Sequence, residues 1–413
     1  MKRATLKKLT RVLRGGFAVV LVLAGTSCGG GNPPGSSSST PTVAAASNVV
    51  SVVVDGGPTP SAPNANTLYT SVTLCVPGST TQCQTIDHIQ VDTGSYGLRV
   101  LAEVLTLALP VSTASNGNSL LECTGFVDGY SWGPIATADL QVAGEKASSV
   151  AVQVIGDKSF SAVPDACAST GSAEDTVGQF GANGIIGIGA LAQDCGTGCV
   201  TDPGYGQYYA CTAGGDCVGV EVPLTAQVQN PVTLFPVDNN GTIIVLPSVS
   251  APGAATLTGS LIFGIDTATN NVSGTQTILT LDPVSGDFTT LFNGQNLTAS
   301  FFDTGTNGIF FNDSSIPECT TDPGFYCPAA TQSFSATVTG QNGVSTTESF
   351  SVANAQTLTT NDPTYTVLPQ LAGVYSSSTD SFDWCLPFFY GRRVATAIEG
   401  YSTSVDSGPY VAF

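Results

Sequence analysis

Two stretches of this chain share one pattern, and together they decide the fold. Residues 88–98 read HIQVDTGSYGL, and residues 299–309 read ASFFDTGTNGI. Each is an apolar run followed by Asp-Thr-Gly, a hydroxyl residue, one variable residue, Gly and an aliphatic residue. The other Asp-Thr pairs, at Asp175 and Asp266, are not followed by Gly. One such match in each half of the chain indicates a duplicated unit.

The chain from about residue 47 onward has the composition of an all-β protein. Val, Ile, Thr, Phe and Tyr recur in short runs bounded by Gly, Pro, Asn and Ser, which is typical of strands separated by turns. Amphipathic helix patterns are scarce, and only 98–109 and 222–228 are predicted as short helices. The predicted strands are 49–54, 68–76, 88–91, 138–142, 150–155, 242–246, 260–265, 300–302, 333–338 and 349–352.

The charge of the chain is divided unevenly along its length. There are 11 Lys and Arg against 30 Asp and Glu, and six of the basic residues precede Phe17. The basic residues after position 27 are Arg99, Lys146, Lys158, Arg392 and Arg393. The body therefore carries about −25 and repels phosphate backbones, so nucleic acid is not an expected partner.

The single histidine, His88, excludes multi-histidine zinc sites, and neither a metal nor a cofactor is expected.

The amino-terminal segment is predicted to direct export. A basic segment, 1–14, precedes an apolar run, 17–24, which is shorter than the roughly 20 residues that span a bilayer. The following GTSC resembles a bacterial lipobox and predicts lipidation of Cys28; plain secretion with an incidental Cys28 is the alternative. We expect a lipoprotein signal peptide over 1–27 and a flexible tether over 28–65. Position 29 is not Asp, which favours the outer membrane, on its periplasmic or cell-surface side.

The cysteines agree with export, because an oxidising compartment favours disulfides over zinc ligation. Equal spacing suggests pairs at Cys75–Cys83 and Cys319–Cys327, and two small disulfides are expected among Cys195, Cys199, Cys211 and Cys217. Cys123 and Cys167 are left to pair across the first half, and Cys385, in an apolar run, is expected to be a buried free thiol. The connectivity within this set stays open at the level of sequence.

The two Asp-Thr-Gly turns suggest a specific chemistry. An Asp at the end of a buried strand, followed by Thr-Gly, is held in a tight turn where Gly lets the backbone approach closely. If the two turns face each other, Asp92 and Asp303 come into contact, and two adjacent carboxyls share one proton. The ionised carboxyl then deprotonates a water while the protonated one donates to a carbonyl oxygen. This is general acid–base hydrolysis without histidine or metal.

These motifs resemble the pepsin-like aspartic proteases, a bilobal all-β family with one Asp-Thr-Gly in each lobe. Further matches follow in the same order, at 68–74, 183–189, 259–266, 384–386 and 408–412, so the resemblance covers about residues 66–413. The whole chain also resembles a group of uncharacterised proteobacterial lipoproteins. The resemblance implies two β-barrel-like lobes with a cleft between them, an amino-terminal lobe over 66–270 and a carboxyl-terminal lobe over 271–413.

The resemblance also implies roles for single residues. Asp92 and Asp303 would be the catalytic pair. The supporting residues of the two turns would be Thr93, Gly94, Ser95, Thr304, Gly305 and Thr306. The substrate would be a peptide or unfolded protein, no cofactor would be needed, and the protein would be a monomer that meets the membrane only through its lipid anchor.

The chain departs from the family pattern at three places. The hairpin over 124–133, which matches the family's flap, has Phe126 where the family has Tyr, and Tyr130 is a second candidate near its tip. Arg99 stands where the family has a Trp that contacts the flap Tyr. Pro387 removes a backbone donor beneath the second turn. Two functions therefore remain open: an aspartic endopeptidase, or a non-catalytic surface protein that uses the same cleft to bind peptide or glycan.

Overall fold

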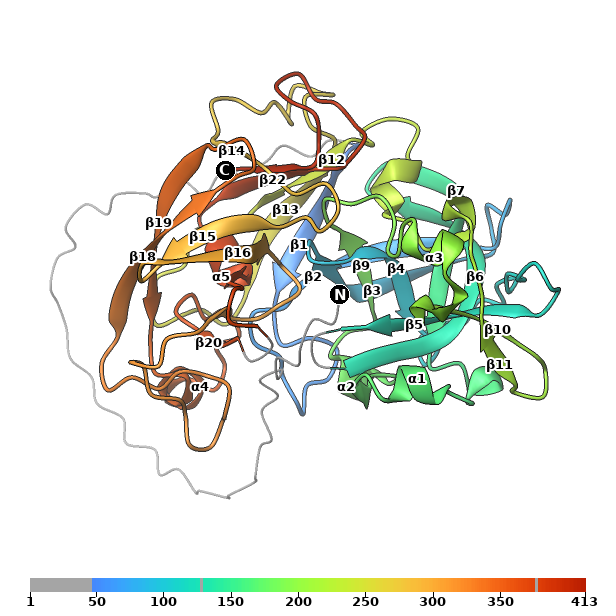
Figure 1. Ribbon diagram of the computed structural model, residues 1–413, viewed down its shortest axis with the longest axis horizontal. Coiled ribbons are helices and arrows are strands. Elements are labelled where there is room, and N and C mark those ends of the chain that lie inside the picture. The colour runs from blue at the N-terminus through green and yellow to red at the C-terminus, as the bar shows by residue number, and fades with distance from the viewer. Residues whose placement is uncertain (1–46, 127–128, 376–377) are drawn as a thin grey trace, which may run out of the picture.

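The structure, a computed structural model, describes residues 47–126, 129–375 and 378–413. Its strands form two lobes that lie side by side, one made mainly of the first half of the chain and one mainly of the second (Figure 1). The predicted signal peptide over 1–27, the predicted lipidation site Cys28 and the predicted tether up to residue 46 lie outside the described residues.

The described part of the chain contains short strands and shorter helices. The strands of the first half are β1 (Val49–Val54), β2 (Leu68–Cys75), β3 (Cys83–Asp92), β4 (Tyr96–Leu101), β5 (Ser119–Gly125), β6 (Gly129–Val142), β7 (Glu145–Ile155), β8 (Ser172–Ala173), β9 (Gly184–Ile188), β10 (Tyr208–Cys211), β11 (Cys217–Gly219), β12 (Gly241–Val245) and β13 (Leu257–Phe263). Those of the second half are β14 (Ile278–Thr280), β15 (Phe288–Phe292), β16 (Gln295–Phe302), β17 (Ile309–Phe311), β18 (Gln332–Thr339), β19 (Ser345–Val352), β20 (Ala372–Val374), β21 (Asp383–Trp384), β22 (Arg393–Ala397) and β23 (Tyr410–Ala412).

The helices connect these strands. They are α1 (Asp165–Ala168), α2 (Val177–Phe180), α3 (Gly198–Thr201), α4 (Ala355–Asn361) and α5 (Leu386–Phe389), with 3₁₀ turns η1 (Lys158–Phe160), η2 (Pro203–Tyr205), η3 (Leu224–Ala226) and η4 (Pro231–Leu234). The helix predicted over 98–109 is wrong at its start, because those residues continue β4. That strand pairs with β7 and β9, and these long-range pairings override a local pattern.

One sheet runs from the first lobe into the second. Its central order is β2-β1-β13-β12-β22-β23-β14, so strands from both ends of the chain are neighbours. Strand β1 corrects the predicted tether over 28–65, because Val49–Val54 pairs with β13 and β2 and buries Val52 and Val54. A run of β-branched residues has the propensity and the apolar surface to join a sheet. The lobe boundary predicted at residue 270 falls in the loop between β13 and β14 and stays a prediction.

The same local topology occurs once in each half. Strand β9 lies parallel to β3 and antiparallel to β4, and it passes beneath the turn that joins them. In the second half β21 lies parallel to β16 and antiparallel to β17. The duplicated unit inferred from the two Asp-Thr-Gly stretches is thus a real structural repeat, and the predicted all-β bilobal fold is confirmed.

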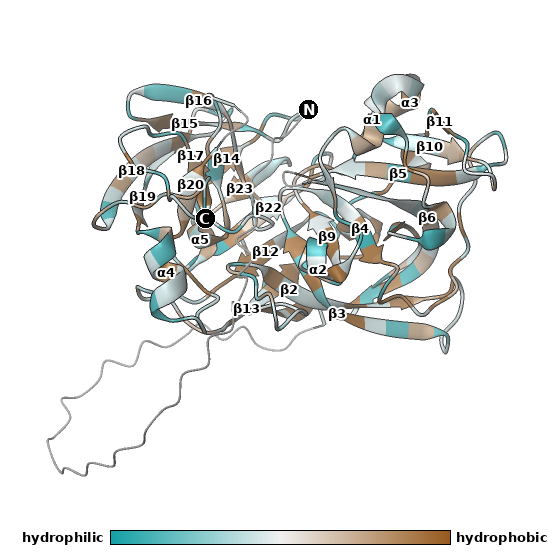
Figure 2. Cartoon of the chain, turned by 90° about the horizontal axis from the view of Figure 1, so that it is seen from below, coloured by the Kyte–Doolittle hydropathy of each residue, from teal (hydrophilic) through white to brown (hydrophobic). Residues whose placement is uncertain are grey.

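The two lobes fill their cores with different residues. Around β3, β4 and β9 the buried apolar side chains are aliphatic, whereas a cluster of aromatic rings fills the second lobe. In that cluster Phe382 stacks between Phe311 and Trp384, with ring centroids 5.1 and 4.5 Å apart. Figure 2 shows apolar residues gathered on the central strands, and hydrophilic ones on elements such as α4.

Five disulfides link the described residues. They are Cys75–Cys83, Cys123–Cys167, Cys195–Cys199, Cys211–Cys217 and Cys319–Cys327, which confirms the predicted pairs and the two small disulfides of the cysteine cluster. Cys385 is a buried free thiol, as expected. Five disulfides indicate a compartment outside the reducing cytoplasm. Within the described ranges no helix has the length and apolarity needed to span a bilayer.

We predict that the Cys123–Cys167 disulfide stabilises the first lobe more than a short-range one. Replacing both residues by Ser should lower the free energy of unfolding by about 4 kcal/mol, against about 2 kcal/mol for the Cys195–Cys199 pair. The reason is the loop that each bond closes in the unfolded chain, since the paired residues are 44 and 4 positions apart. Denaturant unfolding of the two double variants measures this, and equal losses would contradict it.

Candidate functional site

The structure brings the two Asp-Thr-Gly turns together. Asp92 is the last residue of β3, and Asp303 follows the end of β16. A further strand pairs with the backbone at each aspartate. Asp92 is opposite Gly187 of β9, and the Asp303 amide donates to the Trp384 carbonyl of β21 at 3.1 Å. Both aspartates are almost buried, with 5% and 6% of their surface exposed.

The two threonines, Thr93 and Thr304, cross-brace the turns. The Thr93 amide donates to Thr304 Oγ1 at 3.1 Å, and the Thr304 amide donates to Thr93 Oγ1 at 3.0 Å. Each hydroxyl then donates to a carbonyl of the opposite strand, Thr93 Oγ1 to Phe302 at 3.2 Å and Thr304 Oγ1 to Val91 at 2.8 Å. These four bonds join backbone more than 200 residues apart in sequence, and they fix the separation of the two aspartates.

Each carboxylate is oriented by its own turn. The Gly94 amide and Ser95 Oγ donate to the two oxygens of Asp92, the former at 2.6 Å. In the same way the Gly305 amide and Thr306 Oγ1 donate to the two oxygens of Asp303, both at 2.6 Å. All six residues around the two aspartates that the sequence pattern singled out therefore contact a carboxyl or brace a turn, and their part in catalysis stays a prediction.

The two carboxyl groups lie close together, since a Cβ built on Gly305 would be 2.6 Å from Asp92 Oδ1 and 3.0 Å from Asp303 Oδ1. A Cβ added to Gly94 would be 2.7 Å from Asp303 Cγ, and one added to Gly305 would be 2.6 Å from Asp92 Cγ. Any side chain at either position would collide with the opposite carboxyl, which gives a steric reason for both glycines.

The environment raises the pKa of Asp92 well above its ordinary value of 3.8. Burial has the largest effect because it penalises the charged form, and the charge of Asp303 and the hydrogen bond with it add to the shift. The hydrogen bonds from Ser95 and Gly94 oppose it. The pair therefore retains a proton at pH values where an isolated aspartate is ionised, which provides both an acid and a base at one site.

Sequence reasoning missed one contributor to this arrangement. Gln90, buried on β3, donates from Nε2 to the Gly305 carbonyl at 2.7 Å and so ties the first lobe to the second turn. Its signal in the sequence is a polar residue inside an otherwise apolar strand end. A pocket of about 20 Å³, enough for roughly one water, borders Thr93 and Gly94 where the turn meets the 281–286 segment of the second lobe.

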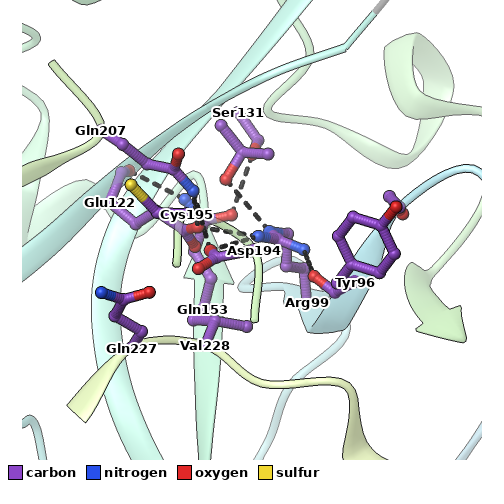
Figure 3. A network of polar contacts seen from close by, with 12 residues as sticks. Tyr96, Arg99, Glu122, Ser131, Gln153, Asp194, Cys195, Gln207, Gln227 and Val228 are labelled. Atoms are coloured by element: carbon purple, nitrogen blue, oxygen red, sulfur yellow. Dashed lines mark hydrogen bonds and ion pairs between the residues drawn. The ribbon is translucent and has the colours of Figure 1, made fainter. Parts of the chain in front are cut away.

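Arg99 is the centre of a buried ionic network (Figure 3). Its Nη2 donates to Glu122 Oε1 at 2.7 Å and to Asp194 Oδ2 at 3.0 Å. Its Nη1 donates to the Tyr96 carbonyl at 2.8 Å, and its Nε to Thr124 Oγ1 at 3.0 Å. Because Glu122 and Thr124 belong to β5, the network connects the strand that follows the first Asp-Thr-Gly turn to the hairpin β5–β6.

The protonation of this network follows from burying two acids with one base. Burial raises the pKa of Asp194 well above its ordinary range, and the charge of Glu122 adds to this. Burial also penalises ionised Glu122, but the charge of Arg99 and hydrogen bonds to Asp194 and Arg99 leave its pKa lowered. Asp194 therefore binds a proton more readily than an exposed aspartate does, and Tyr208 Oη donates to both of its oxygens at 2.9 Å.

The two predicted flap residues lie on the hairpin β5–β6, which extends from the first lobe toward the second in Figure 1. Phe126 precedes the tip, its amide bonded to the Gly129 carbonyl at 2.8 Å, and its ring packs edge-on against Phe180. Tyr130 is 8% exposed and packs in the cluster around the Cys123–Cys167 disulfide. The role of either residue as a flap over the aspartates stays a prediction.

The expected loss of support at Pro387 does not occur in the backbone that holds the second turn. Pro387 lies in the first turn of α5, where a missing N–H is tolerated. The preceding residue, Leu386, donates its amide to the Thr306 carbonyl at 3.2 Å.

The fold and the paired aspartates define the class of structure to which this chain belongs, the bilobal pepsin-like fold. A solved structure of this kind, an aspartic proteinase from Irpex lacteus, superposes with a TM-score of 0.51 over 88% of this chain and 96% of its own. Its sequence identity is 13%, so the likeness concerns the fold. The chain belongs to DUF3443, a family described as proteins of unknown function, which matches residues 44–413. No curated protein sequence matches the chain.

We predict that Asp92 makes the stability of the fold depend on pH. With a raised folded-state pKa, the native protein binds a proton that the unfolded chain has lost above about pH 3.8. Stability therefore falls as pH rises through the window between 3.8 and the raised pKa, by up to about 1.4 kcal/mol per pH unit. Asp92→Asn should flatten this slope in denaturant unfolding at a series of pH values. Asp165→Asn, at an exposed helix end, should keep the wild-type slope; an unchanged slope in Asp92→Asn would count against a shared proton.

We also predict that Arg99 is indispensable to the first lobe. Arg99→Met leaves two buried acids without a cation and should cost about 3–5 kcal/mol of unfolding free energy. Adding Glu122→Gln should restore part of this, because one buried charge is removed. Lys146→Met, at an exposed position, should change stability by less than about 0.5 kcal/mol. Equal effects of Arg99→Met and Lys146→Met in denaturant unfolding would contradict the prediction.

Proposed function

We propose that this protein is an exported aspartic endopeptidase that hydrolyses peptide bonds in peptides or unfolded proteins. The observation that carries the proposal is the close approach of Asp92 and Asp303, with each carboxyl fixed by its own turn. The likeness to an aspartic proteinase supports it at the level of the fold. We further propose that a lipid on Cys28 anchors the mature chain in the outer membrane; the disulfides support export.

The mechanism uses only the groups of the site. The ionised member of the pair removes a proton from a water positioned between the carboxyls, and that water attacks the carbonyl carbon of the peptide. The protonated member donates to the carbonyl oxygen, so the tetrahedral intermediate forms without a bare negative charge. Proton transfer to the amide nitrogen then lets the carbon–nitrogen bond break. The cross-brace of Thr93 and Thr304 holds the pair in place throughout.

One observation favours a second candidate, a binding protein that uses the same cleft without catalysis. The side chain at the predicted flap position, Phe126, packs against Phe180 and carries no hydroxyl to reach a substrate. The hairpin β5–β6 is held by Arg99 and by the Phe126–Phe180 contact. A fixed hairpin of this kind suits a protein that binds a ligand as well as an enzyme that covers its substrate.

The decisive test is cleavage of a denatured protein by the purified chain at acidic pH. Asp92→Asn and Asp303→Asn should each reduce the rate by at least about 10²–10⁴-fold, because each removes one half of the acid–base pair. Asp165→Asn is the matched control and should cleave like the wild type. Cleavage at the wild-type rate by both site variants would refute the endopeptidase. Saturable peptide binding without turnover, retained in Asp92→Asn, would favour the binding protein.

A further inference from the structure

A pocket of about 470 Å³ lies apart from the aspartate pair, between β22 and the loop that leads into β14. Its wall includes Val272, Ser273, Gln276, Arg392, Arg393 and Phe413. None of the residues of the two Asp-Thr-Gly turns lines it. Its volume lies within the range of small-molecule sites, about 300–1,000 Å³.

The charge of this pocket is opposite to that of the protein. Only five basic residues follow position 27, in a body of about −25, yet two of them are adjacent and both line this one pocket. One of the two, Arg392, is paired with Glu348, whereas Arg393 has no ion pair among the described residues. A basic side chain left at a hollow of so acidic a protein points to a negatively charged occupant.

Arg393 is the unsatisfied member of the pair. It is half-buried, and its Nη1 donates to Gln276 Oε1 at 3.0 Å. Gln276 is itself fixed, since its Nε2 donates to the Arg393 carbonyl at 2.7 Å. Within the described residues Arg393 has this neutral side-chain partner and no ion pair, although a guanidinium carries five N–H donors.

The acid whose charge acts on Arg393 is already engaged. Burial lowers the pKa of Arg393, and the charge of Asp266 opposes this. However, Asp266 accepts hydrogen bonds from the Ser273 amide at 2.7 Å, from Ser273 Oγ at 2.5 Å and from Ser404 Oγ at 2.7 Å. It therefore does not form the direct pair that a half-buried guanidinium would gain from an anionic ligand.

Arg392 already has an anionic partner, so it contributes to the pocket wall but is not a second unpaired cation. Its Nη2 donates to Glu348 Oε2 at 2.6 Å, which neutralises it. Its guanidinium carbon lies 4.3 Å above the Phe388 ring and 5.8 Å from that of Phe413. Next to it, Phe413 and the 56% exposed Val272 give the pocket an apolar side.

We propose that this pocket binds a small oxyanion, a carboxylate or phosphate carried on an apolar group, with Arg393 as its principal ligand. The planar fork of Arg393 matches both oxyanions, and the apolar side accommodates the remainder of the molecule. Gln276 holds the guanidinium in place, so little rotational freedom is lost on binding. The site is independent of the proposed peptidase activity.

The test is isothermal titration calorimetry on the full exported chain carrying Cys28→Ser, so that no lipid interferes. The probes are inorganic phosphate, phenyl phosphate and benzoate. We expect saturable binding of at least one of the two aromatic probes, tighter than that of inorganic phosphate. Comparison of phenyl phosphate with benzoate then distinguishes phosphate from carboxylate recognition.

The variants locate the binding. Arg393→Gln should weaken it by at least about tenfold, as expected for a lost charge-assisted contact, and Arg393→Lys should restore only part. Lys146→Gln removes the same charge from an exposed hairpin and should leave affinity unchanged. Val272→Asp, at an exposed rim position, should also abolish binding, because its carboxylate repels the anion. If Arg393→Gln does not fold, the loss or retention of binding in Val272→Asp tests the proposal. No saturable binding, equal losses in Arg393→Gln and Lys146→Gln, or full binding by Val272→Asp would overturn the proposal.

Discussion

The exchange of hydrogen bonds between Thr93 and Thr304 is the constraint on which the site depends. It brings together backbone from two halves of the chain at a point where two carboxyl groups must meet, although like charges at such a distance repel. The cost is limited because one proton is shared and because each carboxyl accepts an amide and a hydroxyl hydrogen bond from its own turn. The braced turns therefore hold an arrangement that two free carboxylates would not adopt.

Each lobe supports its turn with the same topology but different packing. In the first lobe an aliphatic core surrounds β9, and Arg99 with its two acids fastens the neighbouring hairpin. In the second lobe the stacked rings of Phe311, Phe382 and Trp384 lie at strands β17 and β21, which pair near the second turn. Buried ion networks are costly unless every charge is compensated, whereas stacked rings gain from area and geometry alone. The geometry of the aspartates is therefore compatible with two quite different interiors.

Much of the fold and of the site could be predicted from sequence. The meeting of Asp92 and Asp303 could be expected because a repeated motif of six residues is rare in unrelated contexts. Cysteine spacing suggested Cys75–Cys83, Cys319–Cys327 and two small disulfides in the cysteine cluster, because these partners lie close in sequence. The helix expected over 98–109 was wrong at its start, because residues 98–101 form a strand whose partners, β7 and β9, lie far along the chain. The strand predicted at 49–54 is present inside the range given to the tether, and its partner β13 is equally distant in sequence. Local patterns indicate the propensity of a segment but not its partners.

The sequence by itself determined the local chemistry: two turns of one pattern, a chain with a single histidine, and a body with thirty acids and five bases. It could not show how those few bases are used. Arg99 compensates Glu122 and Asp194, which are 23 and 95 residues away, and Arg392 pairs with Glu348, 44 residues away. Arg393 is left with a neutral glutamine at the edge of a pocket. Only the tertiary structure decides this, because the energy of a charge depends on its burial and on the neighbours that folding brings within contact.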